Sequence, residues 1–148
     1  MLPYSEFVPM LWGDGPDKIA GFNQAAKDFA SNGVKAVLSF DEPNGAHDAG
    51  GGSSISPANA AKVHIDVFNE LVGVEIGAPG TTQGADAWWE VCRRRVPPRL
   101  FVVGAQAYES TLQEWTAECE KLGGCNFDFV PFHWYGLDAK VFAKDLVC

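Results

Sequence analysis

The chain has 148 residues, of which 47% are hydrophobic and 12% aromatic, so it is long enough to fold around a core of its own. Its formal net charge of −8 at pH 7 argues against binding to nucleic acid or to an anionic membrane surface, because both favour basic patches. No segment approaches the roughly 20 apolar residues of a membrane-spanning helix, and the first residues do not have the pattern of a secretory signal.

Apolar runs alternate with helical patterns along the chain, and turn-forming residues separate them. In chain order, the sequence first predicts a strand over 6–12, a helix over 17–31, a strand over 34–41, a helix from Ser56 to Gly73 and a strand over 74–78. A helix over 85–94 and an apolar segment over 100–104 follow. The last predicted elements are a helix that opens at the capping box 110–113, a strand over 126–133 and a short helix over 138–146. Strands separated by helices favour parallel pairing with right-handed crossovers, so we expect an α/β protein.

The helix that begins at Ser56 has the clearest start signal. Ser56 suits the N-cap, and Pro57 suits the first helical position. Its apolar stripe is expected to consist of Ala60, Ala61, His64, Phe68 and Leu71. In the helix that follows 110–113, the expected apolar residues are Leu112, Trp115 and Leu122.

Three predicted strands end in side chains that an apolar core would not favour. The first ends at Trp12, the second at Asp41-Glu42 and the last at His133-Trp134-Tyr135. Parallel α/β barrels place catalytic groups at such strand ends. Aromatic rings can stack on sugars, carboxylates supply acid chemistry, and His133 could orient a carboxylate or a sugar hydroxyl. Each residue alone could be an ordinary core or turn residue, but the three ends together favour a site.

Glu42 is the strongest single candidate for chemistry. It follows the apolar run 34–39, and Pro43 stops the strand immediately after it. If the strand stays regular, Asp41 should point to the opposite side from Glu42. The alternative for this segment alone is a strand followed by an acidic turn.

The cysteines indicate the redox environment. Cys119 and Cys125 flank a short segment with two glycines, so a disulfide is favoured there, and it would indicate an oxidising compartment. Two buried thiols are the alternative. A zinc site is disfavoured because the sequence has no Cys-x-x-Cys, and His47, His64 and His133 are scattered.

Five stretches of the sequence form a common pattern. They are Phe7-Val8-Pro9-Met10-Leu11-Trp12-Gly13, Leu38-Ser39-Phe40-Asp41-Glu42-Pro43-Asn44, Ser56-Pro57-Ala58-Asn59-Ala60-Ala61, Gly77-Ala78-Pro79-Gly80-Thr81-Thr82 and Cys125-Asn126-Phe127-Asp128-Phe129-Val130-Pro131-Phe132-His133-Trp134-Tyr135-Gly136. Together they resemble the fungal Asl1-like glycosyl hydrolase catalytic domain, which is glycoside hydrolase family 128 and acts on β-1,3-glucan. They occur in family order and span nearly the whole chain.

The resemblance implies a (β/α)₈ TIM barrel. A full barrel takes about 250 residues. We therefore expect residues 1–148 to form a single, incomplete catalytic domain that covers about the third to sixth strands of the family barrel. Residues 91–108 fit the family poorly and suggest an insertion or a gene-model error. The family and the Cys119/Cys125 pair imply a secreted or cell-wall protein, and the oligomeric state is left open.

The resemblance also implies a retaining mechanism with two glutamates and no metal or organic cofactor. Glu42 corresponds to the general acid/base, and the expected substrate-binding residues are Trp12, Asp41, Asn44, His133, Trp134 and Tyr135. At position 41 the family has an asparagine, so sugar contacts of Asp41 are expected to differ.

The nucleophile is expected in a Trp-x-Thr-Glu-Phe-like segment on the seventh strand, and no such segment occurs in this sequence. We considered Glu75, Asp128 and Asp138 as replacements, and Asp138 is the least unsuitable of them. Two functions are therefore compared: a β-1,3-glucan hydrolase domain, and a non-catalytic β-glucan-binding protein of the cell wall. A third possibility is an inactive fragment that exposes strand edges and aggregates.

Overall fold

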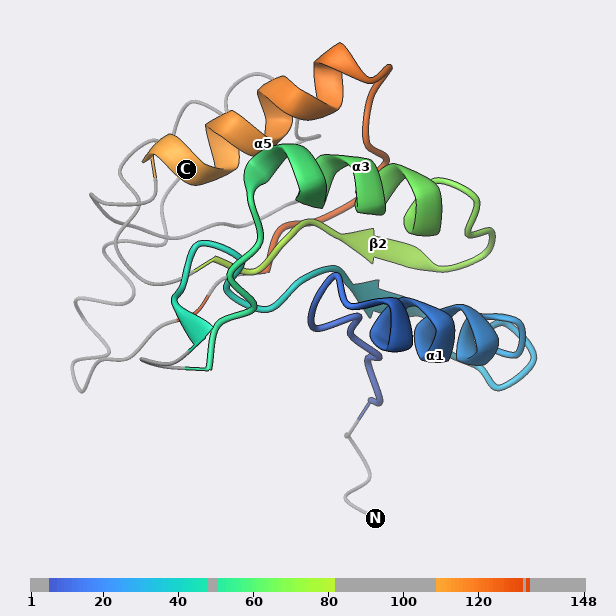
Figure 1. Ribbon diagram of the computed structural model, residues 1–148. Coiled ribbons are helices and arrows are strands. Elements are labelled where there is room, and N and C mark those ends of the chain that lie inside the picture. The colour runs from blue at the N-terminus through green and yellow to red at the C-terminus, as the bar shows by residue number, and fades with distance from the viewer. Residues whose placement is uncertain (1–5, 48–50, 82–108, 132, 134–148) are drawn as a thin grey trace, which may run out of the picture.

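A computed structural model describes residues 6–47, 51–81, 109–131 and 133 of the chain (Figure 1). Its elements, in chain order, are helix α1 (Pro16–Ala26), strand β1 (Ala36–Leu38), helix α3 (Pro57–Phe68), strand β2 (Glu75–Gly77) and helix α5 (Glu109–Lys121). The helices predicted over 85–94 and 138–146, the apolar segment over 100–104 and the proposed insertion over 91–108 lie outside the described residues. None of the helices among the described residues is long and apolar enough to cross a membrane.

Four segments of the chain lie parallel to one another. β1 pairs with β2 in a register that sets Val37 opposite Ile76. Parallel bridges add one segment at each side, because Met10 pairs with Leu38 and Gly77 pairs with Phe129. The segments lie side by side in chain order, so the expected mixed α/β arrangement with parallel pairing is confirmed. The strands predicted over 6–12 and 126–133 are present only as these bridges and their hydrogen bonds.

Pro9 does not interrupt the first of these segments. Its carbonyl oxygen accepts a hydrogen bond from the backbone N–H of Leu38 at 2.8 Å, and the N–H of Leu11 donates to the oxygen of Leu38 at 3.2 Å. The pairing with β1 therefore uses the carbonyl of Pro9 and does not need the N–H that proline lacks.

Helix α1 begins after Gly15 with Pro16 in its first turn, and it ends at Ala26 instead of Ser31. Turns continue to Gly33, whose φ of +73° is a conformation that glycine adopts without strain. Phe29 nevertheless remains buried in these turns and packs against Phe22 with ring centroids 5.4 Å apart. The apolar spacing therefore continues past the helix end, which explains why the sequence pattern overestimates its length.

Helix α3 starts as the sequence predicts. The Ser56 hydroxyl accepts a hydrogen bond from the backbone N–H of Asn59 at 3.3 Å, and Pro57 occupies the first turn. Of the expected stripe, all members except Leu71 are fully buried, and Leu71 is partly buried against the core. The buried face is wider than predicted because it also includes Val63 and Val67.

Aromatic contacts place the three helices on one face of the sheet. Phe68 of α3 packs against Phe22 of α1 with centroids 5.2 Å apart and against Phe40, next to β1, at 6.4 Å. On its other side α3 contacts α5, where the rings of His64 and Trp115 are 5.2 Å apart. Figure 1 accordingly shows α5 beside α3, and α3 above β2. Because the four segments are parallel, their C-terminal ends lie at the same edge of the sheet.

Helix α5 and the turn after it differ in part from prediction. The helix begins at Glu109, one residue before the expected cap Ser110. Trp115 is buried as expected, but Leu122 is 52% exposed because it follows the last helical residue, where Gly123 and Gly124 turn the chain with positive φ angles. The turn leads directly into the predicted disulfide.

The disulfide between Cys119 and Cys125 is confirmed, with an S–S distance of 2.04 Å. It joins the last turn of α5 to the segment that leads into the fourth parallel strand. A disulfide of this kind fits an oxidising compartment.

Candidate active site

The C-terminal ends of three neighbouring parallel segments meet at Asp41. The N–H of Asp41 donates to the oxygen of Trp12 at 3.0 Å, and Asp41 forms a parallel bridge with Gly80. The next N–H, that of Glu42, donates to the oxygen of Gly80 at 2.6 Å. Backbone hydrogen bonds therefore join two of the strand ends singled out in the sequence, those at Trp12 and at Asp41-Glu42, and add the end of β2 at Gly80.

Glu42 is buried at this edge and contacts His133, which comes from the fourth parallel segment. Only 8% of Glu42 is exposed. Its Oε1 atom lies 2.7 Å from Nδ1 of His133. A hydrogen bond between an imidazole N–H and a carboxylate is charge-assisted and stronger than a neutral one. The structure therefore brings together two residues 91 positions apart that the sequence marks only as separate strand ends.

Asp41 approaches the same imidazole from the other nitrogen. Its Oδ1 atom is 3.6 Å from Nε2 of His133, so the two adjacent carboxylates converge on one ring. The expectation that Asp41 and Glu42 point to opposite sides is wrong because the strand is not regular there: Glu42 has a φ of +39°, in the left-handed region. A non-glycine residue in that region is strained, and such strain is concentrated at functional sites.

The loop of small residues after Glu42 has a structural role that the sequence does not reveal. Ser53 donates from both its N–H and its hydroxyl to the oxygen of Asp41, at 3.0 and 2.7 Å. The N–H of Gly45 donates to the oxygen of Glu42 at 2.8 Å. A Cβ atom on Gly52 would lie 2.8 Å from that same Glu42 oxygen, so only glycine fits there. The loop returns to the site and fixes the backbone of both acidic residues.

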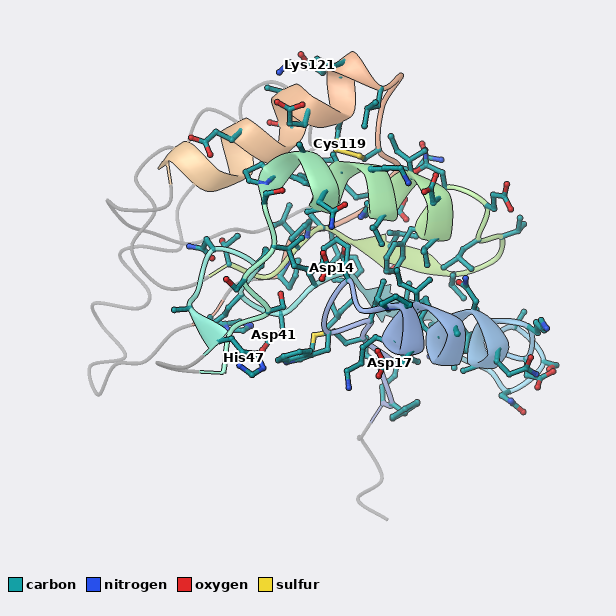
Figure 2. All side chains as sticks on the ribbon, in the orientation of Figure 1. Asp14, Asp17, Asp41, His47, Cys119 and Lys121 are labelled. Carbon is teal, nitrogen blue, oxygen red and sulfur yellow. A yellow bond between two sulfur atoms is a disulfide. The ribbon has the colours of Figure 1, made fainter. Side chains whose placement is uncertain are left out.

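Trp12 also departs from extended geometry, with a φ of +37°. Its ring is partly exposed and packs edge-on against His47, with centroids 5.9 Å apart. Lys18 Nζ lies 5.9 Å from the centroid of the same ring. Figure 2 labels the side chains of Asp41 and His47 on the ribbon. His47 and Lys18 thus contact the ring of Trp12, and the backbone oxygen of Trp12 accepts the hydrogen bond from the N–H of Asp41.

Of the other predicted site residues, Asn44 alone is among the residues that the structure describes. Asn44 is exposed in the turn after Pro43. Trp134, Tyr135 and the candidate carboxylate Asp138 lie outside the described residues.

The two other carboxylates considered as nucleophiles lie away from Glu42. Glu75 is exposed at the start of β2, at the opposite end of the sheet from Gly80. Asp128 accepts a hydrogen bond from the N–H of Ile76 at 2.8 Å, also near the start of β2. Glu75 is therefore a surface residue, and Asp128 has a structural role in the sheet. Within the described part of the chain, no group of three or more His, Cys, Asp or Glu residues could hold a metal ion.

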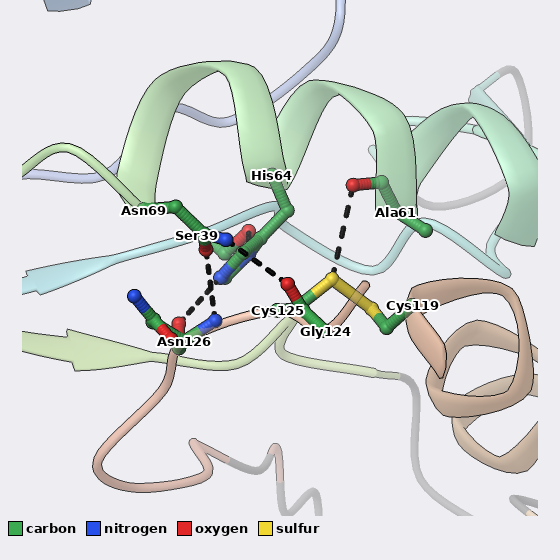
Figure 3. Close-up of a disulfide and its surroundings, with 8 residues drawn as sticks. All are labelled: Ser39, Ala61, His64, Asn69, Cys119, Gly124, Cys125 and Asn126. Atoms are coloured by element: carbon green, nitrogen blue, oxygen red, sulfur yellow. Dashed lines mark hydrogen bonds between the residues drawn. A yellow bond between two sulfur atoms is a disulfide. The ribbon is translucent and has the colours of Figure 1, made fainter. Parts of the chain in front are cut away.

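His64 is buried far inside the helix-covered face and belongs to a separate network (Figure 3). Its Nε2 lies 2.8 Å from the oxygen of Asn126, and its Nδ1 lies 3.1 Å from the Ser39 hydroxyl. Since a carbonyl only accepts, Nε2 carries the hydrogen and Nδ1 accepts from Ser39. Burial lowers the pKa of His64 from 6.5 to about 4, and the hydrogen bond to Asn126 opposes part of that effect. His64 is therefore a neutral bridge between α3, β1 and the fourth segment.

Comparison with known proteins identifies the family of the chain. The model of a protein family described as the glycosyl hydrolase catalytic core matches residues 2–147. No curated protein matches the sequence.

Three solved structures of GH128 β-1,3-glucanases are similar to this chain. A curdlan-specific exo-β-1,3-glucanase of subgroup III from Blastomyces gilchristii, in complex with glucose, is 26% identical, with a TM-score of 0.62 over 92% of this chain and 47% of that chain. A subgroup I endo-β-1,3-glucanase variant from Amycolatopsis mediterranei, in complex with laminarihexaose, is 25% identical, with a TM-score of 0.56, and the match covers 90% of this chain and 42% of that chain. A subgroup IV endo-β-1,3-glucanase from Lentinula edodes is 27% identical, with a TM-score of 0.54, and the match covers 88% of this chain and 41% of that chain. The chain thus spans less than half the length of these structures.

Proposed function

Because this chain belongs to the glycosyl hydrolase catalytic core family, we propose that it is a glycoside hydrolase domain that acts on β-1,3-glucan. The similar solved structures support this substrate, since they are β-1,3-glucanases and two of them hold glucose or laminarihexaose. The observation that carries the proposal is the contact between Glu42 and His133 at the ends of parallel strands.

We propose that the four parallel segments are part of a (β/α)₈ barrel, about its third to sixth strands. They pair in chain order, and the helices between them lie on one face, as in a barrel wall. In such a barrel the C-terminal strand ends carry the chemistry. Trp12, Glu42 and Gly80 are all at that end.

Glu42 is proposed to be the general acid/base. As an acid it would protonate the leaving glycosidic oxygen, and as a carboxylate it would then accept a proton from the attacking water. Burial and the His133 contact hold its side chain at a fixed position, which this double role requires. A retaining reaction needs a second carboxylate about 5–5.5 Å away as the nucleophile. We assign that role to none of the described acidic residues.

Sugar binding is proposed for the residues around Glu42. The partly exposed ring of Trp12 offers a flat apolar surface on which a glucose ring could stack. Asp41, Asn44 and His133 supply polar groups next to it, and the sequence places Trp134 and Tyr135 directly after His133. These residues together would bind a neutral polysaccharide without a metal ion or an organic cofactor.

A secreted or cell-wall location is proposed from the family and the disulfide. The Cys119–Cys125 bond would persist in an oxidising compartment, where a polysaccharide-degrading enzyme meets its substrate.

The test is reducing-sugar release from β-1,3-glucan by a version of the protein that spans the whole proposed barrel, including the strand that would carry the nucleophile, and by Glu42→Gln in that version. We expect release by the wild type and a loss of about 10²–10⁴-fold in the variant, the usual contribution of acid–base catalysis. Gln has nearly the same shape as Glu, so the fold should be retained. Glucan binding without release by the folded wild type would contradict the hydrolase proposal and favour a non-catalytic glucan-binding protein instead.

A further inference from the structure

The peptide group between Asp41 and Glu42 is held at both of its ends. Its carbonyl oxygen, on Asp41, accepts hydrogen bonds from the N–H of Ser53 at 3.0 Å and from the Ser53 hydroxyl at 2.7 Å. Its N–H, on Glu42, donates to the oxygen of Gly80 at 2.6 Å. A carbonyl oxygen has two lone pairs, and Ser53 supplies a donor for each of them. This peptide group therefore has little freedom to rotate.

The peptide group that follows Glu42 is held as well. The carbonyl oxygen of Glu42 accepts a hydrogen bond from the N–H of Gly45 at 2.8 Å. The α carbon of Glu42 thus lies between two fixed peptide groups, and their orientations set its φ of +39°. A residue with a Cβ atom is strained at this φ and keeps it only where the surrounding structure holds it. The two hydrogen bonds from Ser53 are among the contacts that do so.

The left-handed backbone decides where the Glu42 carboxylate points. In a regular strand, successive side chains point to opposite faces, so Asp41 and Glu42 would diverge. Here Oε1 of Glu42 lies 2.7 Å from Nδ1 of His133, and Oδ1 of Asp41 lies 3.6 Å from Nε2 of the same ring. A return of Glu42 to extended geometry would therefore carry its carboxylate away from His133.

Ser53 occupies a well-anchored position between two strand ends. A Cβ atom on Gly13 would lie 3.5 Å from Cβ of Ser53, so Ser53 packs against the residue that follows Trp12. Further along the chain, the N–H of Ile55 donates to the oxygen of Pro43 at 2.8 Å, and the Ile55 side chain is buried in the core. The Ser53 hydroxyl is therefore presented to Asp41 from a fixed backbone.

We propose that Ser53 is a positioning residue for Glu42. Its hydroxyl keeps the peptide group between Asp41 and Glu42 in the orientation that turns the Glu42 carboxylate toward His133. Ser53 acts on the reaction through the backbone of Glu42. The catalytic meaning of this role rests on the proposed function, but the effect of Ser53 on the Glu42 backbone does not.

The direct test is the carbon-13 spectrum of labelled glutamate in the barrel-spanning version of the protein, as wild type and as Ser53→Ala. The Cα and Cβ shifts of Glu42 depend on whether its backbone is left-handed or extended. Ser53→Ala removes the hydroxyl donor and keeps the N–H donor. We expect the Glu42 signals of this variant to move toward extended values, or a second, extended set to appear. Glu42 signals identical to those of the wild type would overturn the proposal.

Ser54→Ala is the matched control. Ser54 is the next residue, it is exposed, and it also has a positive φ, of +52°. Because serine and alanine both carry a Cβ atom, neither substitution changes the backbone strain at its own position. We expect the Glu42 signals of Ser54→Ala to match those of the wild type. An equal displacement in both variants would mean that the spectrum reports a general disturbance of the loop, and it would contradict a specific role of Ser53.

Kinetics distinguish a positioning residue from a residue that only stabilises the fold. Ser53→Ala should lower kcat on β-1,3-glucan by about tenfold, a fraction of the full acid–base effect, and leave KM within about twofold. An oligosaccharide with dinitrophenol as its leaving group needs no acid, so its first turnover should stay within about twofold of the wild type. Equal losses on both substrates would assign Ser53 a structural role and contradict the proposal.

The two measurements separate this proposal from the proposed function. If the Glu42 signals of Ser53→Ala change as expected but the wild type releases no sugar, the positioning of Glu42 by Ser53 is supported and the proposed function alone fails. If the wild type releases sugar and Ser53→Ala matches it in both spectrum and rate, the proposed function stands and the role of Ser53 is refuted.

Discussion

Gly80 and His133 are in such close contact that a Cβ atom on Gly80 would lie 3.3 Å from Nε2 of the imidazole. This distance is shorter than an ordinary van der Waals contact, so a side chain at position 80 would push His133 by a few tenths of an ångström. The ring is also the hydrogen-bond partner of Glu42 at 2.7 Å. Gly80 therefore helps to fix the position of His133 and, through it, of Glu42, the proposed acid/base.

Gly80→Ala should reduce glucan hydrolysis several-fold while it changes the free energy of unfolding by less than about 1 kcal/mol, because one methyl group meets a ring that can shift slightly. Hydrolysis rates and urea denaturation would measure the two effects. Gly21→Ala is the control, since a Cβ atom at this position in α1 would meet nothing within 4 Å. That variant should gain about 1 kcal/mol of stability from helix propensity and keep full activity. Equal activity of both variants would show that His133 does not depend on Gly80.

The positive φ of Glu42 predicts that a glycine at this position gives a more stable protein than an alanine. At +39°, a residue with a Cβ atom is strained by about 1–2 kcal/mol relative to glycine. Glu42→Gly and Glu42→Ala both lose the contact with His133, but only Glu42→Gly relieves the strain. We expect Glu42→Gly to be more stable than Glu42→Ala by about 1 kcal/mol in urea denaturation. The reverse order, typical of a regular strand or helix, would mean that the backbone at this position is not left-handed.

Some of these features could be predicted from the sequence, and others could not. The start of α3 is encoded locally, because Ser56 and Pro57 satisfy the needs of a helix N-terminus within one turn. The alternation of strands and helices likewise predicts parallel pairing, which β1 and β2 confirm. The sequence pattern places the end of α1 too late, because Phe29 stays buried in the turns that follow the helix.

The arrangement of the candidate site could not be predicted from sequence periodicity. The contact of His133 with both Asp41 and Glu42 depends on the sheet register across residues far apart in the chain and on a local left-handed residue. No sequence pattern marks Gly52, although its close approach to the Glu42 oxygen restricts that position to glycine. Such backbone contacts have no pattern of their own in a single sequence.

The buried His64 predicts that stability falls in mild acid. In the unfolded chain this imidazole takes up a proton below about pH 6.5, whereas in the fold it does so only near pH 4. Between these values the unfolded state binds more protons, so the free energy of unfolding decreases as the pH is lowered, by about 3 kcal/mol in total. Above pH 6.5 His64 is neutral in both states and contributes no slope.

Urea denaturation at a series of pH values would measure this effect. His64→Gln removes the titrating group, so its stability relative to the wild type should improve as the pH falls from 6.5 toward 4. A constant difference between the two proteins across this range would contradict the assignment of His64 as a buried neutral group.

The Cys119–Cys125 bond should stabilise the fold moderately. It closes a short loop, with a sequence separation of 6, so the loss of chain entropy in the unfolded state corresponds to about 2 kcal/mol. The bond also fixes the segment around Asn126, the acceptor of the His64 hydrogen bond (Figure 3). Reduction should lower Tm, and the Cys119→Ala/Cys125→Ala double variant should have a low Tm that no longer responds to reductant. A Tm that is the same with and without reductant in the wild type would argue against the bond.

The central claim is that Glu42 acts as the general acid, and the dependence of rate on the leaving group tests it most directly. A β-1,3-linked glucose oligosaccharide with dinitrophenol as its leaving group can lose that group without protonation. The leaving sugar of the glucan polymer, in contrast, must be protonated by an acid. In Glu42→Gln we predict that the first turnover of the dinitrophenyl substrate stays within about tenfold of the wild type, while hydrolysis of the polymer falls by about 10²–10⁴-fold. Equal losses on both substrates would contradict the claim and assign Glu42 a structural role.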